Sequence, residues 1–152
     1  MKYFCTLAIL CCLSLAAQAQ TKNPTYDKAL ADSLGADDYG MKSYVLVLLK
    51  TGTAKIEDQQ KVAELFRGHL SNIGKLAEEG KLVVAGPLGK NDKAYRGIFI
   101  LNVATVEEAA ALVQTDPAIK EKLLAVELYP WYGSAALPVY LQTHSKIEKI
   151  KP

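Results

Sequence analysis

The chain has 152 residues, half of them hydrophobic, and its 18 basic and 16 acidic residues give a formal net charge of +2. Because no basic stripe runs along the sequence, nucleic acid is an improbable class of partner. All three cysteines, Cys5, Cys11 and Cys12, lie within the first twenty residues. The rest of the chain therefore offers no disulfide scaffold, no thiol nucleophile and no cysteine-based zinc site.

Residues 1–19 have the pattern of a secretory signal peptide. Lys2 gives a positive start, an apolar run extends from Tyr3 to about Leu15, and small residues precede the expected cleavage before Gln20. The run is shorter than the roughly 20 apolar residues of a membrane-spanning helix, so a retained anchor is the less favoured alternative. We expect an exported protein, periplasmic or secreted, that has no membrane partner after cleavage.

Residues 20–42 are polar and are predicted to form a leader before the domain. Asn23, followed by a proline, reads as the cap of a short helix that Gly35 ends. The acidic pair Asp37 and Asp38 could suggest a cation site, but a solvated turn is far more common and no calcium-ligand spacing accompanies it.

A strand–helix–strand–strand–helix–strand pattern occupies residues 43–132. The expected strands cover 44–49, 81–86, 95–103 and 123–130, and the expected helices cover 56–79 and 105 to about 115. Gly80 ends the first helix, and Thr105 with Glu108 forms a capping box at the second. This order predicts an α+β fold, a ferredoxin-like βαββαβ sandwich with both helices on one face of an antiparallel sheet. Residues 133–152 are left as a C-terminal tail.

Both faces of the predicted sheet are apolar. The first strand alternates between two apolar sets, Tyr44, Leu46 and Leu48 on one face and Val45, Val47 and Leu49 on the other. The two helices can cover only one of these faces. A second subunit is the economical cover for the other, with two sheets stacked at about 10 Å. We therefore expect a homodimer.

His69 lies on the inner half of the first helix, where the helical repeat calls for an apolar residue. An imidazole is a general acid or base near neutral pH, and it works best when a carboxylate fixes its tautomer. Asp116, at the end of the second helix, is the best candidate carboxylate, because the two helices lie side by side in this fold. Its other role is structural, since aspartate before proline is a favoured helix start.

Gly68 precedes this histidine inside the predicted helix. A glycine there costs about 1 kcal/mol relative to alanine. It would allow another backbone or a ligand to approach closely, or it is merely tolerated on an exposed face. The second histidine, His144, lies in a basic tail and is expected to be solvated.

Four further residues are candidate substrate contacts, each with a plainer alternative. Arg96 could hold an anionic group, although a surface arginine is more common. Gly86 could bring backbone amides to a pocket rim, or it simply turns the chain with the following proline. Tyr129 and Trp131 offer flat apolar surfaces with polar edges, as in small-molecule sites, but they are as often core or dimer contacts.

The sequence resembles the YciI-like (YCII-related) family over about residues 44–132. The resemblance is carried by an ordered set of segments: YVLVLL, GHL, GKLVVAGP, TVEEAAAL, TDPAIKEKLL and LYPWY. It implies a ferredoxin-like subunit that dimerises into an α/β barrel, with an active site built on a His–Asp pair that maps onto His69 and Asp116. The wider dimeric barrel superfamily includes isomerases, lyases, oxygenases and haem enzymes. The signal, leader and tail are departures from small cytoplasmic members.

Three functions follow as hypotheses. The leading one is an exported acid–base enzyme of isomerase or lyase type, without a cofactor, which uses His69 and Asp116 on an unknown small, cyclic or aromatic molecule. The second is a non-catalytic module that binds a small molecule in the same pocket. The third is a metal or haem site at His69, which the scarcity of histidine and cysteine disfavours, and we predict no metal ligands.

Overall fold

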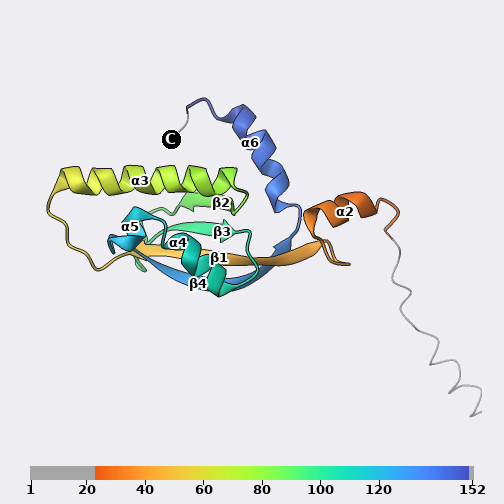
Figure 1. Ribbon diagram of the computed structural model, residues 1–152, viewed down its shortest axis with the longest axis horizontal. Coiled ribbons are helices and arrows are strands. Elements are labelled where there is room, and N and C mark those ends of the chain that lie inside the picture. The colour runs from red at the N-terminus through yellow and green to blue at the C-terminus, as the bar shows by residue number, and fades with distance from the viewer. Residues whose placement is uncertain (1–22, 151–152) are drawn as a thin grey trace, which may run out of the picture.

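The computed structural model describes residues 23–150, so the predicted signal peptide lies outside the described part (Figure 1). Within this range, no helix is both long and apolar enough to cross a membrane. The elements in chain order are α2 (Lys28–Leu34), β1 (Met41–Thr51), α3 (Gln59–Glu78), β2 (Leu82–Pro87), β3 (Tyr95–Leu101), α4 (Val106–Val113), α5 (Pro117–Lys120), β4 (Leu124–Ser134), the 3-10 helix η1 (Leu137–Tyr140) and α6 (Leu141–Ile147).

The four strands form one antiparallel sheet in the order β2-β3-β1-β4. The central strand β1 pairs with β3 on one side and with β4 on the other, and β2 lies outside β3. This is the predicted α+β, ferredoxin-like arrangement, which the structure confirms.

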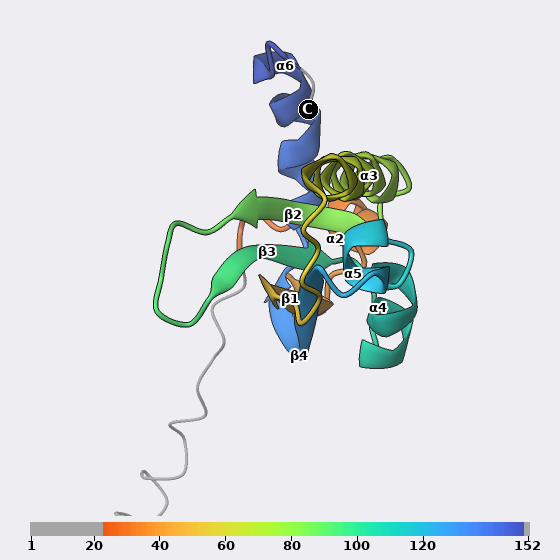
Figure 2. The same ribbon diagram turned by 90° about the vertical axis from the view of Figure 1, so that its left-hand side faces the viewer.

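Helices α3, α4 and α5 cover one face of the sheet (Figure 2). The β1 side chains on this face, Val45, Val47 and Leu49, are buried in the main core. Leu82, Phe99 and Leu101 join them from the neighbouring strands. Burying one such aliphatic or aromatic side chain contributes about 1.5–3 kcal/mol, so this inner set is a major source of the stability of the core.

The opposite sheet face is also apolar, as the alternation predicts. Leu46 and Leu48 are half-buried on it, and the register places them beside Ile100 and Ile98. At one end of this face Lys50 forms an ion pair with Glu127, with 2.7 Å between Nζ and Oε1.

The N-terminal segment forms the predicted helix with a different cap. Asp27 caps α2 by accepting a hydrogen bond from the Leu30 amide, whereas the Asn23 side chain accepts from the amide of Thr25 and makes a turn. The expected cap at Asn23 is therefore wrong by about one helical turn, because the proline that follows it belongs to that turn. Gly35 ends the helix in the left-handed region, as predicted, with φ 68°.

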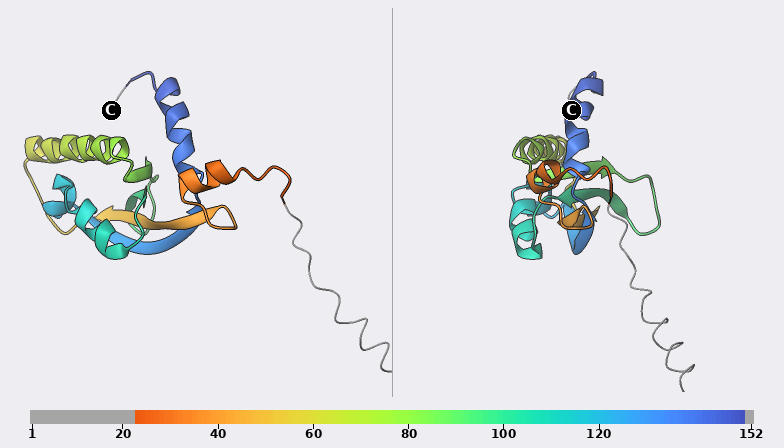
Figure 3. Two further views of the ribbon diagram at one scale, coloured as in Figure 1. Left: turned by 45° about the vertical axis from the view of Figure 1, so that its right-hand side comes forward. Right: turned by 90° about the vertical axis from the view of Figure 1, so that its right-hand side faces the viewer.

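The end of the chain is more structured than a simple tail. Strand β4 continues to Ser134, where Tyr44 donates a hydrogen bond to the Ser134 carbonyl. After η1, helix α6 extends away from the sheet beyond the C-terminal end of α3 (Figures 1 and 3). The Tyr140 hydroxyl donates to the Val83 carbonyl of β2, which ties this segment to a sheet edge. These helical turns were not predicted from hydrophobic periodicity, because the proline within η1 reads as a helix breaker.

Candidate functional site

His69 and Asp116 meet in the interior of the protein. The His69 Nδ1 atom lies 2.5 Å from Oδ2 of Asp116, and the two residues are 8% and 1% exposed. The other oxygen, Oδ1, accepts a hydrogen bond from the Ala118 amide at 2.9 Å and so caps α5. Both roles foreseen for Asp116, helix cap and histidine partner, are thus filled at once, one by each carboxylate oxygen.

This arrangement assigns the tautomer of the neutral ring. An ionised carboxylate can only accept a hydrogen bond, so Nδ1 must carry the proton that lies between the two residues. The remaining nitrogen of His69, Nε2, makes no hydrogen bond to any residue of the described range 23–150. No side-chain nitrogen or oxygen in that range is both fully buried and unpartnered, so Nε2 keeps some access to the space beside it.

Gly68 explains how the two residues come within reach of each other. A Cβ atom at this position would lie 2.5 Å from Cγ of Pro117, the first residue of α5. Only a residue without a side chain lets α5 approach α3 so closely. The close-approach interpretation of Gly68 therefore holds, and the approaching group is the proline that follows Asp116.

Two aromatic rings hold the imidazole on its other sides. Phe99 of β3 stacks on the His69 ring with 5.9 Å between centroids, and Phe66 meets it edge-on at 6.3 Å. Phe66 is 41% exposed although it lies on the apolar stripe of α3. The stripe is therefore not packed flush against the sheet at this point.

The space beside His69 is a cavity of about 820 Å³ between α3 and the sheet. Apolar side chains dominate its wall, and the cavity is lined by Leu49, Thr51, Phe66, His69, Leu70, Ile73, Ala85, Gly86, Pro87, Leu88, Arg96, Gly97, Phe99, Leu123 and Leu124. A cavity of this size and lining suits a small, largely apolar molecule.

The structure brings two of the four candidate substrate contacts to this cavity. Arg96 lines it, and its Nε donates to Oγ1 of Thr51 at 2.7 Å. Gly86 lines it as well, and a Cβ added there would meet nothing within 4 Å. The backbone of Gly86 thus lies at the cavity, but a larger residue would fit there as well.

Tyr129 and Trp131 lie elsewhere. The register pairs them with Leu46 and Tyr44, on the sheet face opposite the helices. Trp131 packs against the ring of Tyr44 at 5.7 Å between centroids. Tyr129 donates a hydrogen bond to Glu127, which raises the pKa of the tyrosine hydroxyl. Neither of the two side chains lines the cavity that contains His69.

Sequence reasoning missed Thr51, Phe66 and Leu70 as site residues. Thr51 continues the set formed by Val45, Val47 and Leu49, so the single polar residue at the end of that set was a usable signal. Phe66 and Leu70 read as core because helical periodicity shows which face is apolar, but not whether that face is filled.

The described residues contain no group of three or more His, Cys, Asp or Glu side chains placed to hold a metal ion. The chemistry available at the cavity is that of one imidazole nitrogen, a carboxylate behind it and one guanidinium. Such a set can take a proton from a bound molecule and return it, and it can pair with an anionic oxygen.

Comparisons with known proteins give a match to one sequence family and a set of similar solved structures. The sequence profile of the YCII-related domain matches residues 44–132. No curated protein matches the chain by sequence. Among similar solved structures is 5-chloro-2-hydroxyhydroquinone dehydrochlorinase from Burkholderia phenoliruptrix, in complex with 2,5-dihydroxybenzoquinone. It shares 22% identity with this chain, and the match covers 57% of this chain and 92% of the other, with a TM-score of 0.41.

Proposed function

The chain belongs to the YCII-related domain family, and from this premise we propose that it is an acid–base enzyme of isomerase or lyase type acting on a small molecule in the cavity beside His69. The observation that carries the proposal is the buried pair of Nδ1 and Oδ2, 2.5 Å apart, on a histidine that lines the cavity and whose Nε2 has no hydrogen-bond partner among residues 23–150. No cofactor is needed for a reaction that requires only one positioned base.

In the proposed mechanism, His69 accepts a proton through Nε2 from a carbon next to a carbonyl group of the substrate. Asp116 holds the ring in the tautomer that leaves Nε2 unprotonated, and it stabilises the positive charge that forms on the ring. The same nitrogen then returns the proton to another atom, which completes an isomerisation, or the carbanion expels a leaving group, which completes an elimination. A positioned general base typically contributes about 10²–10⁴-fold to the rate.

The test is deuterium exchange at carbon next to a carbonyl, followed by NMR in heavy water across a panel of small cyclic ketones and lactones. We expect the wild-type protein to catalyse exchange in at least one member, and His69→Ala to lose that activity while keeping its circular dichroism spectrum. His144→Gln is the matched control and should retain it. Equal exchange by wild type and His69→Ala would end the acid–base proposal.

A non-catalytic binding module is the second candidate, because the apolar cavity would suit it equally well. It predicts a different result in the same panel. A compound would bind saturably, protect residues around the cavity, and be recovered without deuterium at any carbon. Exchange above the uncatalysed rate would exclude this alternative.

We also propose that the protein is a homodimer whose two sheets stack through the face that carries Leu46, Leu48, Ile98 and Ile100. Support comes from the half-buried state of these apolar side chains in the single chain. Leu48→Lys should give a monomer in analytical ultracentrifugation, because a lysine would be desolvated in the interface. Leu30→Lys, on the exposed surface of α2, is the control and should remain a dimer.

Export is proposed on the pattern of residues 1–19. Expression of the full chain with a C-terminal tag should yield a protein outside the cytoplasm whose first residue is Gln20. A cytoplasmic protein that retains Met1 would contradict this assignment.

A further inference from the structure

Arg96 reaches the cavity because of an irregularity in the sheet. The register between β1 and β3 pairs Leu49 with Gly97 and Lys50 with Tyr95, which leaves Arg96 as one extra residue on β3. Strict alternation with Phe99 in the core would send the Arg96 side chain to the opposite sheet face. A β-bulge re-aims a side chain in this way, and here it turns the arginine toward Thr51 and the cavity.

The loop before Arg96 is built to hold this position. Ala94 adopts a left-handed conformation, with φ 57°, and its carbonyl accepts a hydrogen bond from the Thr51 amide at 3.1 Å. The Asn91 side chain binds the loop at both ends, since Nδ2 donates to the Gly89 and Tyr95 carbonyls and Oδ1 accepts from the Lys93 and Tyr95 amides. The bulge is therefore a fixed feature of this end of the sheet.

Thr51 orients the guanidinium. Its hydroxyl oxygen accepts the hydrogen bond that Nε of Arg96 donates, so the edge formed by the two terminal nitrogens of Arg96 remains for a ligand. Within residues 23–150 no carboxylate lies within ion-pair distance of Arg96. Two terminal N–H groups side by side match the two oxygens of a carboxylate.

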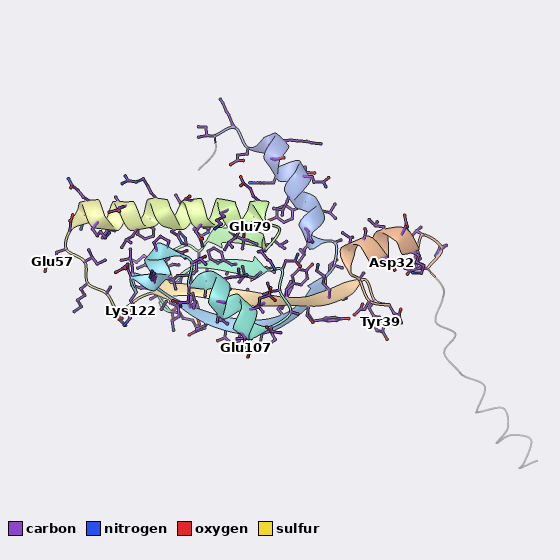
Figure 4. All side chains as sticks on the ribbon, viewed as in Figure 1. Asp32, Tyr39, Glu57, Glu79, Glu107 and Lys122 are labelled. Atoms are coloured by element: carbon purple, nitrogen blue, oxygen red, sulfur yellow. The ribbon has the colours of Figure 1, made fainter. Side chains whose placement is uncertain are left out.

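The distribution of charge around the cavity also favours an anionic ligand. No acidic residue is among those that line it, and Asp116 is held behind the ring of His69. Acidic side chains such as Glu79, which follows α3, and Glu107 on α4 are exposed on the outside of the molecule (Figure 4). An anion entering the cavity therefore meets Arg96 without a competing carboxylate.

We propose that the cavity is specific for a small apolar molecule that carries one carboxylate, which Arg96 binds through its two terminal nitrogens while Thr51 positions the guanidinium. This inference rests on the proposed function in that it concerns the same cavity. It adds the class of substrate: an apolar body beside His69 and an anionic end at the bulge.

The experiment is a calorimetric titration of the mature protein with benzoate and with its neutral isostere benzamide. We expect wild type to bind benzoate at least about tenfold more tightly than benzamide, since the charged pair is worth at least that factor. Arg96→Gln should abolish this preference. The control Lys93→Gln, in the loop but not on the cavity wall, should keep it.

Thr51 is tested by a pair of variants. Thr51→Val removes the oxygen that accepts from Nε and should reduce the benzoate preference, whereas Thr51→Ser keeps the oxygen and should restore it. A merely structural role would make both variants alike in their preference.

Three results would overturn the inference: no saturable binding of benzoate by wild type, equal binding of the two probes, or an undiminished preference in Arg96→Gln. Binding is measured without turnover, so the two proposals can fail separately. A benzoate preference without any deuterium exchange in the ketone panel refutes only the acid–base function. Exchange without a benzoate preference refutes only the substrate class.

Discussion

Replacing Gly68 with alanine should separate the two helices that bring the His–Asp pair together. The new Cβ would lie 2.5 Å from Cγ of Pro117. An ordinary carbon–carbon contact is about 3.5 Å or more, so α5 must retreat by roughly 1 Å. The distance between His69 Nδ1 and Asp116 Oδ2, now 2.5 Å, would then approach about 3.5 Å, beyond the hydrogen-bond range.

The change in the free energy of unfolding has two parts of opposite sign. Overpacking of this kind costs about 1–3 kcal/mol, while alanine in place of glycine within a helix gains about 1 kcal/mol. Gly74 is the matched control, because it lies in the same helix and a Cβ there would meet nothing within 4 Å. Gly74→Ala should therefore be stabilising by up to about 1 kcal/mol.

Urea denaturation of wild type, Gly68→Ala and Gly74→Ala measures these differences. We expect Gly68→Ala to be about 1–3 kcal/mol less stable than Gly74→Ala, the difference that isolates the clash with Pro117. Deuterium exchange of any substrate found for the wild type should fall in the same variant. If the two alanine variants are equally stable, the account of Gly68 as the point of close approach is refuted.

Two further outcomes concern the ends of the chain. The hydrogen bond from Tyr132 raises the pKa of that residue from 10.0 to about 12 and lowers the pKa of Asp37 from 3.8. In urea denaturation, the free energy of unfolding of wild type should therefore exceed that of Tyr132→Phe by the largest amount near neutral pH. This difference should shrink as the pH falls below 3.8 and as it rises from 10.0 to about 12. A difference that does not depend on pH would contradict the coupling of the two groups. Tyr140→Phe removes the bond to the Val83 carbonyl, so it should cost about 1 kcal/mol and speed amide hydrogen exchange over 137–147, whereas unchanged exchange would argue against docking of this segment.

Much of the fold follows from local signals in the sequence. The alternation of Val45, Val47 and Leu49 with Leu46 and Leu48 predicts a strand that is apolar on both faces, and the structure has it. The alternation alone does not decide which of the two sets faces the helices, because both sets are apolar. One helix cap was also predictable. Thr105 accepts a hydrogen bond from the Glu108 amide as expected, whereas the Glu108 side chain pairs with Lys81 and does not complete the capping box.

The candidate site was only partly predictable. His69 stood out because it breaks an apolar stripe, and Asp116 because the fold places the two helices side by side. The position of Arg96 depends on a β-bulge, which arises from a loop conformation that includes Ala94 at φ 57°. Alanine is an uncommon residue for that conformation, so no sequence signal announced the bulge. The cavity itself is a matter of unfilled volume, which hydrophobic periodicity does not report.

The most direct test of the His–Asp account is the tautomer of His69, read from the ring nitrogens in long-range proton–nitrogen NMR spectra of wild type and Asp116→Asn. Wild type should carry the proton on Nδ1. In the variant, the amide oxygen is expected to stay on the Ala118 amide as the helix cap, which turns the side-chain NH₂ group toward Nδ1. The proton should then move to Nε2, the wrong nitrogen for a base that faces the cavity. A wild-type ring protonated on Nε2, or the same tautomer in both proteins, would contradict the central claim that Asp116 prepares His69 for proton transfer.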